Sequence, residues 1–148
     1  MGMDERPEDK LTILLAEDDY AIRDIIATMC DLWDFNVLTF KDGNVASAYL
    51  ADDDPAAPLP DVAILDIRMP GPWGHEIGAM IRRHPRLNNM GIILMTAYEL
   101  AGKDESAYIE HSGADRLIYK PLPSMDELFE VVQDVLAARR ANGNGHAG

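Results

Sequence analysis

The sequence predicts an α/β fold built on a doubly wound, five-stranded parallel sheet. Two observations support this class: short apolar runs recur along the chain, and a segment of helical periodicity separates each run from the next. Parallel strands joined in this way need right-handed crossovers, which place helices on both faces of the sheet. Ligands of such sheets bind beyond the carboxyl ends of the strands, so the functional residues are expected at that edge.

Five apolar runs are interpreted as the strands. They cover residues 11–16, 36–40, 62–65, 91–96 and 116–119. Turn formers or charged residues follow the runs, as expected of short strands that are buried on both faces of a sheet.

The segments between and after these runs carry apolar residues at the spacing of one helix face. The predicted helices cover residues 22–33, 42–51, 74–84, 101–112 and a stretch that begins at Met125. Asp19 is the expected N-cap of the first helix, and Gly113 is the residue expected to end the fourth. Ser124 precedes Glu127 by the spacing of a capping box at the last helix.

The composition is that of one soluble domain. The 148 residues suffice for a core, and no apolar run is long enough to span a membrane. Residues 11–140 are expected to form the domain, after a flexible lead-in at 1–10 and before a disordered tail at 141–148. The single cysteine, Cys30, excludes an internal disulfide, and the N-terminus lacks a signal-peptide pattern, so a cytoplasmic location is expected. The net charge of −13 argues against nucleic acid and membrane partners.

Polar side chains at four predicted strand ends are the candidate functional residues. Taken singly, each has an ordinary structural role, such as a turn former, a helix cap or a surface lysine. Because the carboxyl ends of parallel strands meet at one edge of the sheet, we expect these side chains to converge. They are the acidic run Glu17-Asp18-Asp19, Asp66, Thr96 and Lys120.

This combination of residue types suits phosphate chemistry. Carboxylates that lie close together repel unless a cation neutralises them, and a few oxygen ligands with room for water favour Mg²⁺. A carboxylate can attack phosphorus and form an acyl phosphate, while a lysine and a metal ion spread the charge of the phosphoryl oxygens.

The residues resemble those of the receiver domains of two-component response regulators, over most of the chain from Leu11 to Leu136. The segments that carry the resemblance are "ILLAEDD", "VAILDIRMPGPWG", "ILMTA" and "YKP". The family resemblance implies a flavodoxin-like (βα)₅ fold with strand order 2-1-3-4-5. It implies that Asp66 is the phosphoacceptor and that Mg²⁺ is held by Asp18, Asp66, the backbone carbonyl of Arg68 and, through water, Glu17.

The same resemblance assigns the remaining site positions. Thr96 corresponds to the switch hydroxyl, Ala97 to the small residue beside the phosphoryl group, and Lys120 to the site lysine. The Lys120–Pro121 bond is expected to be cis, as it is in the family. Arg68 and Tyr98 occupy the positions that control access of water to the phosphoryl group.

One position departs from the family pattern. Receivers usually carry Tyr or Phe three residues before the lysine, and Leu117 stands there in this chain. Tyr119 lies on the same side of the strand as Leu117, because side chains alternate along a strand. Either Leu117 performs a reduced version of the aromatic switch, or Tyr119 substitutes for it.

The resemblance implies a phosphorelay protein rather than an enzyme with an external substrate. A sensor histidine kinase or a histidine phosphotransfer protein would donate the phosphoryl group, and the changed surface would bind a downstream protein target. The chain would catalyse only its own phosphorylation and dephosphorylation.

Two alternatives remain at this stage. One is a pseudo-receiver that binds its partner without phosphorylation, which the change at Leu117 keeps open. The other is a metal-dependent phosphohydrolase with an aspartate nucleophile. One family of that kind carries a second aspartate two residues after the nucleophile as acid/base, and Arg68 stands at that position in this chain.

Overall fold

The computed structural model describes residues 10–52, 54, 57, 59–97 and 102–146, and these form five strands and five helices in strict alternation. The strands are β1 (Thr12–Ala16), β2 (Asn36–Phe40), β3 (Val62–Asp66), β4 (Gly91–Thr96) and β5 (Arg116–Tyr119). The helices are α1 (Tyr20–Leu32), α2 (Gly43–Ala51), α3 (Gly74–Arg83), α4 (Gly102–Ser112) and α5 (Met125–His146).

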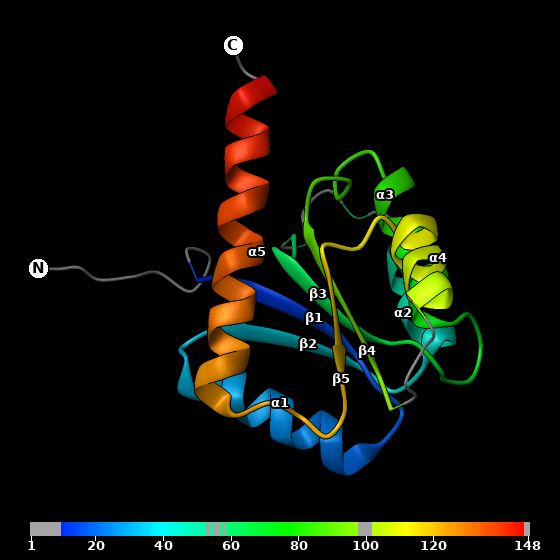
Figure 1. Ribbon diagram of the computed structural model, residues 1–148, viewed down its shortest axis with the longest axis vertical. Helices are drawn as coiled ribbons and strands as arrows, with labels where there is room; N and C mark the ends of the chain where they lie inside the picture. The colour runs from blue at the N-terminus through cyan, green and yellow to red at the C-terminus, as the bar shows by residue number, and fades with distance from the viewer. Residues whose placement is uncertain (1–9, 53, 55–56, 58, 98–101, 147–148) are drawn as a thin grey trace, which may run out of the picture.

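The strands form one parallel sheet in the order β2-β1-β3-β4-β5, which confirms the predicted fold class and strand order. Helices α1 and α5 cover one face of the sheet, and α2, α3 and α4 cover the other (Figure 1). Every residue of β1, β3 and β4 is buried, so these strands read as continuous apolar runs rather than as alternating ones.

Two apolar cores follow from this arrangement, one on each face of the sheet. Alternate residues of each central strand enter different cores: Leu65 of β3 packs with α2 and α3, and Ile64 packs with α1 and α5. Burial of this kind stabilises the fold by about 1.5–3 kcal/mol for each large aliphatic side chain.

The predicted helix ends are confirmed. The Asp19 carboxylate accepts a hydrogen bond of 3.1 Å from the Ile22 amide at the start of α1. Ser124 and Glu127 bond reciprocally at the start of α5, each side chain accepting from the other's amide at 3.1 and 3.0 Å. Gly113 follows α4 with a φ of 69°, a left-handed conformation that favours glycine.

The structure differs from the sequence expectation at the C-terminal end. Helix α5 ends at His146 and therefore enters the segment 141–148, for which the sequence predicts disorder. Ala141 is a strong helix former but residues 142–146 are not, and these residues continue a helix that is already nucleated, which is easier than starting one. Residues 1–9 of the expected lead-in and residues 147–148 lie outside the described residues. Within the described part, no helix has the length and apolar character to cross a membrane.

An ion-pair network joins three elements at the amino edge of the sheet. The Asp115 carboxylate accepts hydrogen bonds from Arg139 of α5 at 2.9 Å and from Arg82 of α3 at 3.3 Å. It also accepts from the Ile92 amide at 2.9 Å, so the start of β4 is held by the same group. This network fixes α3 and α5 against the edge opposite to the one where the predicted functional residues lie.

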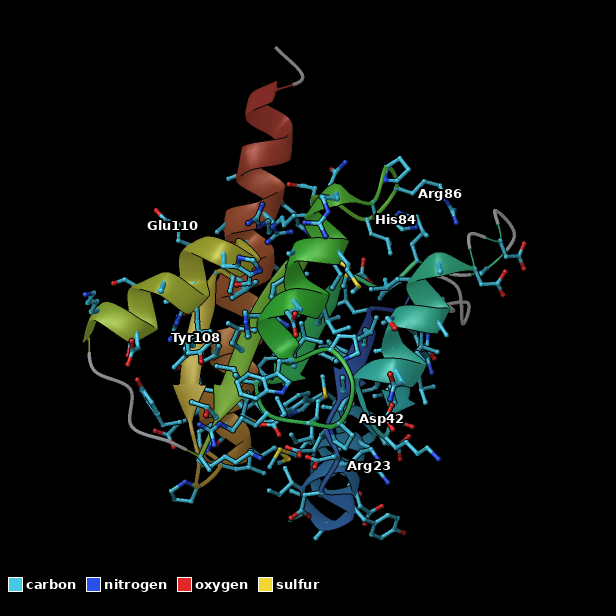
Figure 2. The ribbon with its side chains drawn as sticks, turned by 90° about the vertical axis from the view of Figure 1, so that its right-hand side faces the viewer. Arg23, Asp42, His84, Arg86, Tyr108 and Glu110 are labelled. Atoms are coloured by element: carbon cyan, nitrogen blue, oxygen red, sulfur yellow. The ribbon has the colours of Figure 1, made fainter. Side chains whose placement is uncertain are left out.

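The two edges of the sheet differ in what they carry. Figure 2 shows Arg23 and Asp42 at the carboxyl edge, and His84 and Arg86 at the opposite end of the molecule. Arg23 belongs to α1, and its guanidinium donates a hydrogen bond of 2.7 Å to the Glu17 carbonyl. This hydrogen bond ties α1 to the end of β1 at the carboxyl edge.

Candidate functional site

Three carboxylates meet at the carboxyl edge of the sheet. Glu17 and Asp18 directly follow β1, and Asp66 is the last residue of the neighbouring strand β3. One oxygen from each of the three lies within 4.8 Å of the others. Glu17 and Asp66 are buried, whereas Asp18 is exposed, so the cluster opens to water on one side. The predicted convergence of these residues is what the structure shows.

Lys120, the residue directly after β5, brings a cation into this cluster. Its Nζ lies 2.9 Å from Glu17 Oε1 and 3.3 Å from Asp66 Oδ1, and its side chain is only 14% exposed. The Lys120 amide also donates to the Thr96 carbonyl at 2.8 Å, which extends the β4–β5 pairing as far as the site. The Lys120–Pro121 peptide bond is cis, as the family resemblance implied.

The electrostatics of Asp66 reflect this crowding. Burial, followed by the negative charge of Glu17, raises the pKa of Asp66 from 3.8 to about 7, although Lys120 acts in the opposite direction. Burial alone would lower the pKa of Lys120, but its hydrogen bond to Glu17 and the charge of Asp66 raise it. One lysine therefore does not neutralise the cluster, and the site favours the arrival of more positive charge.

The donor set fits a hard divalent cation. All of the converging side-chain ligands are carboxylate oxygens, which suit Mg²⁺ better than the softer metals. The exposure of Asp18 leaves room for the waters that Mg²⁺ usually retains.

Strand β4 brings Thr96, and Ala97 after it, to the carboxyl edge of the sheet. Thr96 is the last residue of β4, is 2% exposed, and follows Met95, which is the register partner of Asp66. Thr96 is thus one residue beyond the cross-strand partner of Asp66. Ala97 follows at the surface, while Tyr98 lies outside the described residues.

The two residues considered for the aromatic switch have different surroundings. Leu117 packs against the core formed with α2 and α3. Tyr119 is the register partner of Thr96, and its hydroxyl donates a hydrogen bond to the Glu105 carboxylate in the first turns of α4. Tyr119 therefore makes a hydrogen bond to α4, whereas Leu117 shares an apolar cluster with Tyr108 of that helix.

The turn between β3 and α3 packs tightly against the end of β3, where Asp66 lies. A Cβ at Gly74 would lie 2.2 Å from the Asp66 carbonyl oxygen, so only glycine permits this approach. Within the turn, the Arg68 guanidinium lies over the Trp73 ring, with Cζ 5.4 Å from the ring centroid. Sequence reasoning missed Trp73 and Arg23, because neither follows a strand end and no spacing marks them.

A comparison with known protein families agrees with this fold. The model of the response regulator receiver domain matches residues 13–133. This chain belongs to that family. Receiver domains are signalling modules of two-component systems rather than classical enzymes. The cluster of Glu17, Asp18 and Asp66 is a group of carboxylates that could hold Mg²⁺.

Relatives of this receiver have diverse names. It is 42% identical over 80 residues to stress response regulator protein 1 of Debaryomyces hansenii, covering 53% of this chain and 32% of that protein. It is 29% identical to the probable methanogenesis regulatory protein FilR2 of Methanothrix harundinacea, covering 86% of this chain and 83% of that protein. It is 28% identical to the phosphate regulon transcriptional regulatory protein PhoB of Pseudomonas aeruginosa, covering 90% of this chain and 54% of that protein. The receiver thus spans only part of several relatives.

Solved structures agree on the fold. A CheY-like receiver domain protein from Methanospirillum hungatei JF-1 superposes with a TM-score of 0.75 at 22% identity, covering 90% of this chain and 98% of that one. The response regulator TrrA of Thermotoga maritima, solved in complex with Mg²⁺-BeF, superposes with a TM-score of 0.68 at 28% identity. The match covers 85% of this chain and 99% of that one. The TrrA complex carries both a metal and a fluoride compound of beryllium on the same fold.

Proposed function

We propose that this receiver accepts a phosphoryl group on Asp66 and switches a protein-binding surface in response. The observation that carries the proposal is the position of Asp66, which lies 3.3 Å from Lys120 and within 4.8 Å of the ligand oxygens of Glu17 and Asp18. Nucleophile, cation and metal-binding carboxylates are the groups that phosphoryl transfer requires, because its catalysis depends mainly on positioning and on charge stabilisation.

In the proposed transfer, an oxygen of Asp66 attacks phosphorus. The Asp66 O–P bond forms as the donor's P–N bond breaks, and the electron pair stays with the donor's imidazole nitrogen, which then takes up a proton. Asp18, Asp66, the Arg68 carbonyl and, through water, Glu17 would hold Mg²⁺, which neutralises charge on the phosphoryl oxygens. Lys120, whose Nζ lies 3.3 Å from Asp66 Oδ1, would stabilise the charge of the same oxygens.

Reversal of the signal is a hydrolysis at the same atom. Water attacks phosphorus, the Asp66 O–P bond breaks, and Asp66 returns to a carboxylate while the water's proton leaves with inorganic phosphate. Arg68 and Tyr98 are proposed to set the rate of this step through their control of water access. Ala97, a small and exposed residue directly after β4, is proposed to leave space beside the phosphoryl group.

Tyr119 is proposed to report the state of the site to α4 in place of the usual aromatic residue. It stands between Thr96, its cross-strand partner, and Lys120, its neighbour in the chain, and its hydroxyl reaches Glu105. A movement of Thr96 towards a phosphoryl oxygen would change the space beside Tyr119 and, through Glu105, the position of α4.

The proposed partners follow from this chemistry. A sensor histidine kinase or a histidine phosphotransfer protein would supply the phosphoryl group, and it would dock beside α1, where Tyr20 and Ile25 are exposed. The downstream partner is proposed to be a protein. The absence of a nucleic acid partner and the cytoplasmic location remain expectations from charge and composition.

Intact-mass spectrometry with a small phosphodonor tests the proposal. The protein with Mg²⁺ and acetyl phosphate should gain one base-labile phosphoryl group, and it should gain none with a chelator or in Asp66→Asn. Asp42→Asn is the matched control, because it removes a carboxylate at the same edge of the sheet and should label like the wild type. Failure of the wild type to label with either acetyl phosphate or a histidine kinase would instead favour a pseudo-receiver, and continuous turnover of a phosphate ester would favour a hydrolase.

A further inference from the structure

The turn from β3 to α3 contains a contact that the proposed chemistry does not yet use. The Arg68 guanidinium lies over the Trp73 ring, with Cζ 5.4 Å from the centroid, inside the range of a cation–π interaction. Arg68 is exposed and follows Asp66 by two residues, while Trp73 is half-buried and directly precedes α3. The contact therefore joins the first and last parts of the turn beside the phosphoacceptor.

The backbone of this turn is held in place at both ends. The Gly74 amide donates a hydrogen bond of 2.9 Å to the Ile67 carbonyl, which closes the turn. Gly74 also approaches the Asp66 carbonyl so closely that a Cβ there would lie 2.2 Å from the oxygen. Because Trp73 is bonded directly to Gly74, its backbone is held close to Asp66, and partial packing of its ring against the core limits the ring's movement.

The helix itself gives little reason for a tryptophan at this position. Trp73 is the N-cap of α3, a place where Ser, Thr, Asp or Asn normally supply an oxygen acceptor for the first amides. An indole N–H can only donate. The Glu76 carboxylate instead accepts from the Trp73 amide at 2.8 Å, a bond that any residue except proline could make. The ring packs partly against the core, so a purely apolar role is the alternative to be tested.

We propose that Trp73 is a positioning residue for Arg68, holding its guanidinium beside the phosphoryl group on Asp66 and thereby slowing hydrolysis. This inference rests on the proposed function. A guanidinium is always charged and presents a planar set of donors that matches phosphate oxygens. Stacking on a ring whose movement is limited restricts a long, flexible side chain before the anion arrives, so less entropy is lost when the two meet. A guanidinium held there also occupies part of the space through which water must approach phosphorus.

A double-mutant cycle on the rate of phosphoryl loss tests this role. Wild type, Trp73→Leu, Arg68→Ala and the double variant are phosphorylated with acetyl phosphate and Mg²⁺, freed of the donor, and followed by intact mass. Trp73→Leu should speed the loss about two- to fivefold, the factor equivalent to an exposed cation–π contact. It should cause no further change when Arg68 is already alanine. Trp73→Tyr, which keeps an aromatic face, should restore a rate close to that of the wild type.

The outcomes separate this inference from the proposed function. An acceleration of equal size in both backgrounds would mean that Trp73 acts through packing alone, and an unchanged rate in Trp73→Leu would equally overturn its role. If Trp73→Leu does not fold, Arg68→Lys takes its place: it keeps the charge but not the planar stack, so faster loss is expected, and a wild-type rate would refute the inference. If the wild type itself never becomes phosphorylated, the proposed function has failed instead.

Discussion

Replacing Asp66 with asparagine should stabilise the protein near neutral pH when no divalent cation is present. Burial and the charge of Glu17 raise the pKa of Asp66 from 3.8 to about 7, so the folded site disfavours the charged carboxylate. As pH rises, the Asp66 carboxyl group loses its proton at a lower pH in the unfolded chain than in the folded protein. Wild-type stability therefore falls from about pH 4 to about pH 7, and the full cost is present above that range. Asparagine removes the charge and keeps the shape.

The magnitude follows from the size of the pKa shift. A shift of about three units at about 1.4 kcal/mol per unit gives an upper bound of about 4 kcal/mol. Because the cluster opens to water at Asp18, screening reduces this, and we expect Asp66→Asn to raise the free energy of unfolding by about 2 kcal/mol near pH 8. Near pH 4 the difference should approach zero, since the folded wild type then carries a protonated Asp66.

Urea denaturation in the presence of a chelator, followed by circular dichroism near both pH values, measures this difference. Asp42→Asn is the control: it removes a carboxylate but keeps a side-chain oxygen for the Val45 amide at the start of α2, so it should change stability by less than about 0.5 kcal/mol. An Asp66→Asn variant that is no more stable than the wild type near pH 8 would refute the reasoning, as would a gain that is the same near pH 4. Added Mg²⁺ should stabilise the wild type more than the variant.

Three further predictions concern other parts of the molecule. Asp115→Asn removes the negative partner of two largely buried arginines, Arg82 and Arg139. In urea denaturation it should lower the free energy of unfolding by about 2–4 kcal/mol. A change below that range would show that the network contributes little. Gly74→Ala places a Cβ 2.2 Å from the Asp66 carbonyl oxygen. It should lower the free energy of unfolding by about 1–3 kcal/mol and slow the labelling of Asp66 by acetyl phosphate. A variant with wild-type stability and labelling would contradict this packing. Tyr119→Phe removes the hydrogen bond to α4 and should increase amide hydrogen exchange in that helix while Asp66 still becomes labelled; unchanged exchange would argue against a Tyr119 link.

Much of the fold could be predicted from the sequence, for a physical reason. Strands buried on both faces must be continuous apolar runs, and the runs at 62–65 and 91–96 agree closely with β3 and β4. Helix ends depend on side chains a few residues away, so Asp19 and the Ser124–Glu127 pair could be assigned locally. The convergence of strand-end residues follows from the parallel sheet itself, because every strand points towards the same edge.

The extent of α5 was not predictable in the same way. Asparagines and glycines after Ala141 favour disorder by composition, yet the helix ends only at His146. Packing of the preceding turns on the sheet, with Arg139 held by Asp115, provides a nucleus that a local reading of the tail does not include.

By itself, the sequence determined the class of the protein, the strand order through its family resemblance, and the residues at the carboxyl edge. Only the tertiary structure decided which of these residues touch: Lys120 bridges Glu17 and Asp66, and Tyr119 reaches α4. Such contacts depend on the rotamers of long side chains and on the distances between elements far apart in the chain. Local propensity and periodicity carry no information about either, so the pairing of Arg68 with Trp73 could be found only in three dimensions.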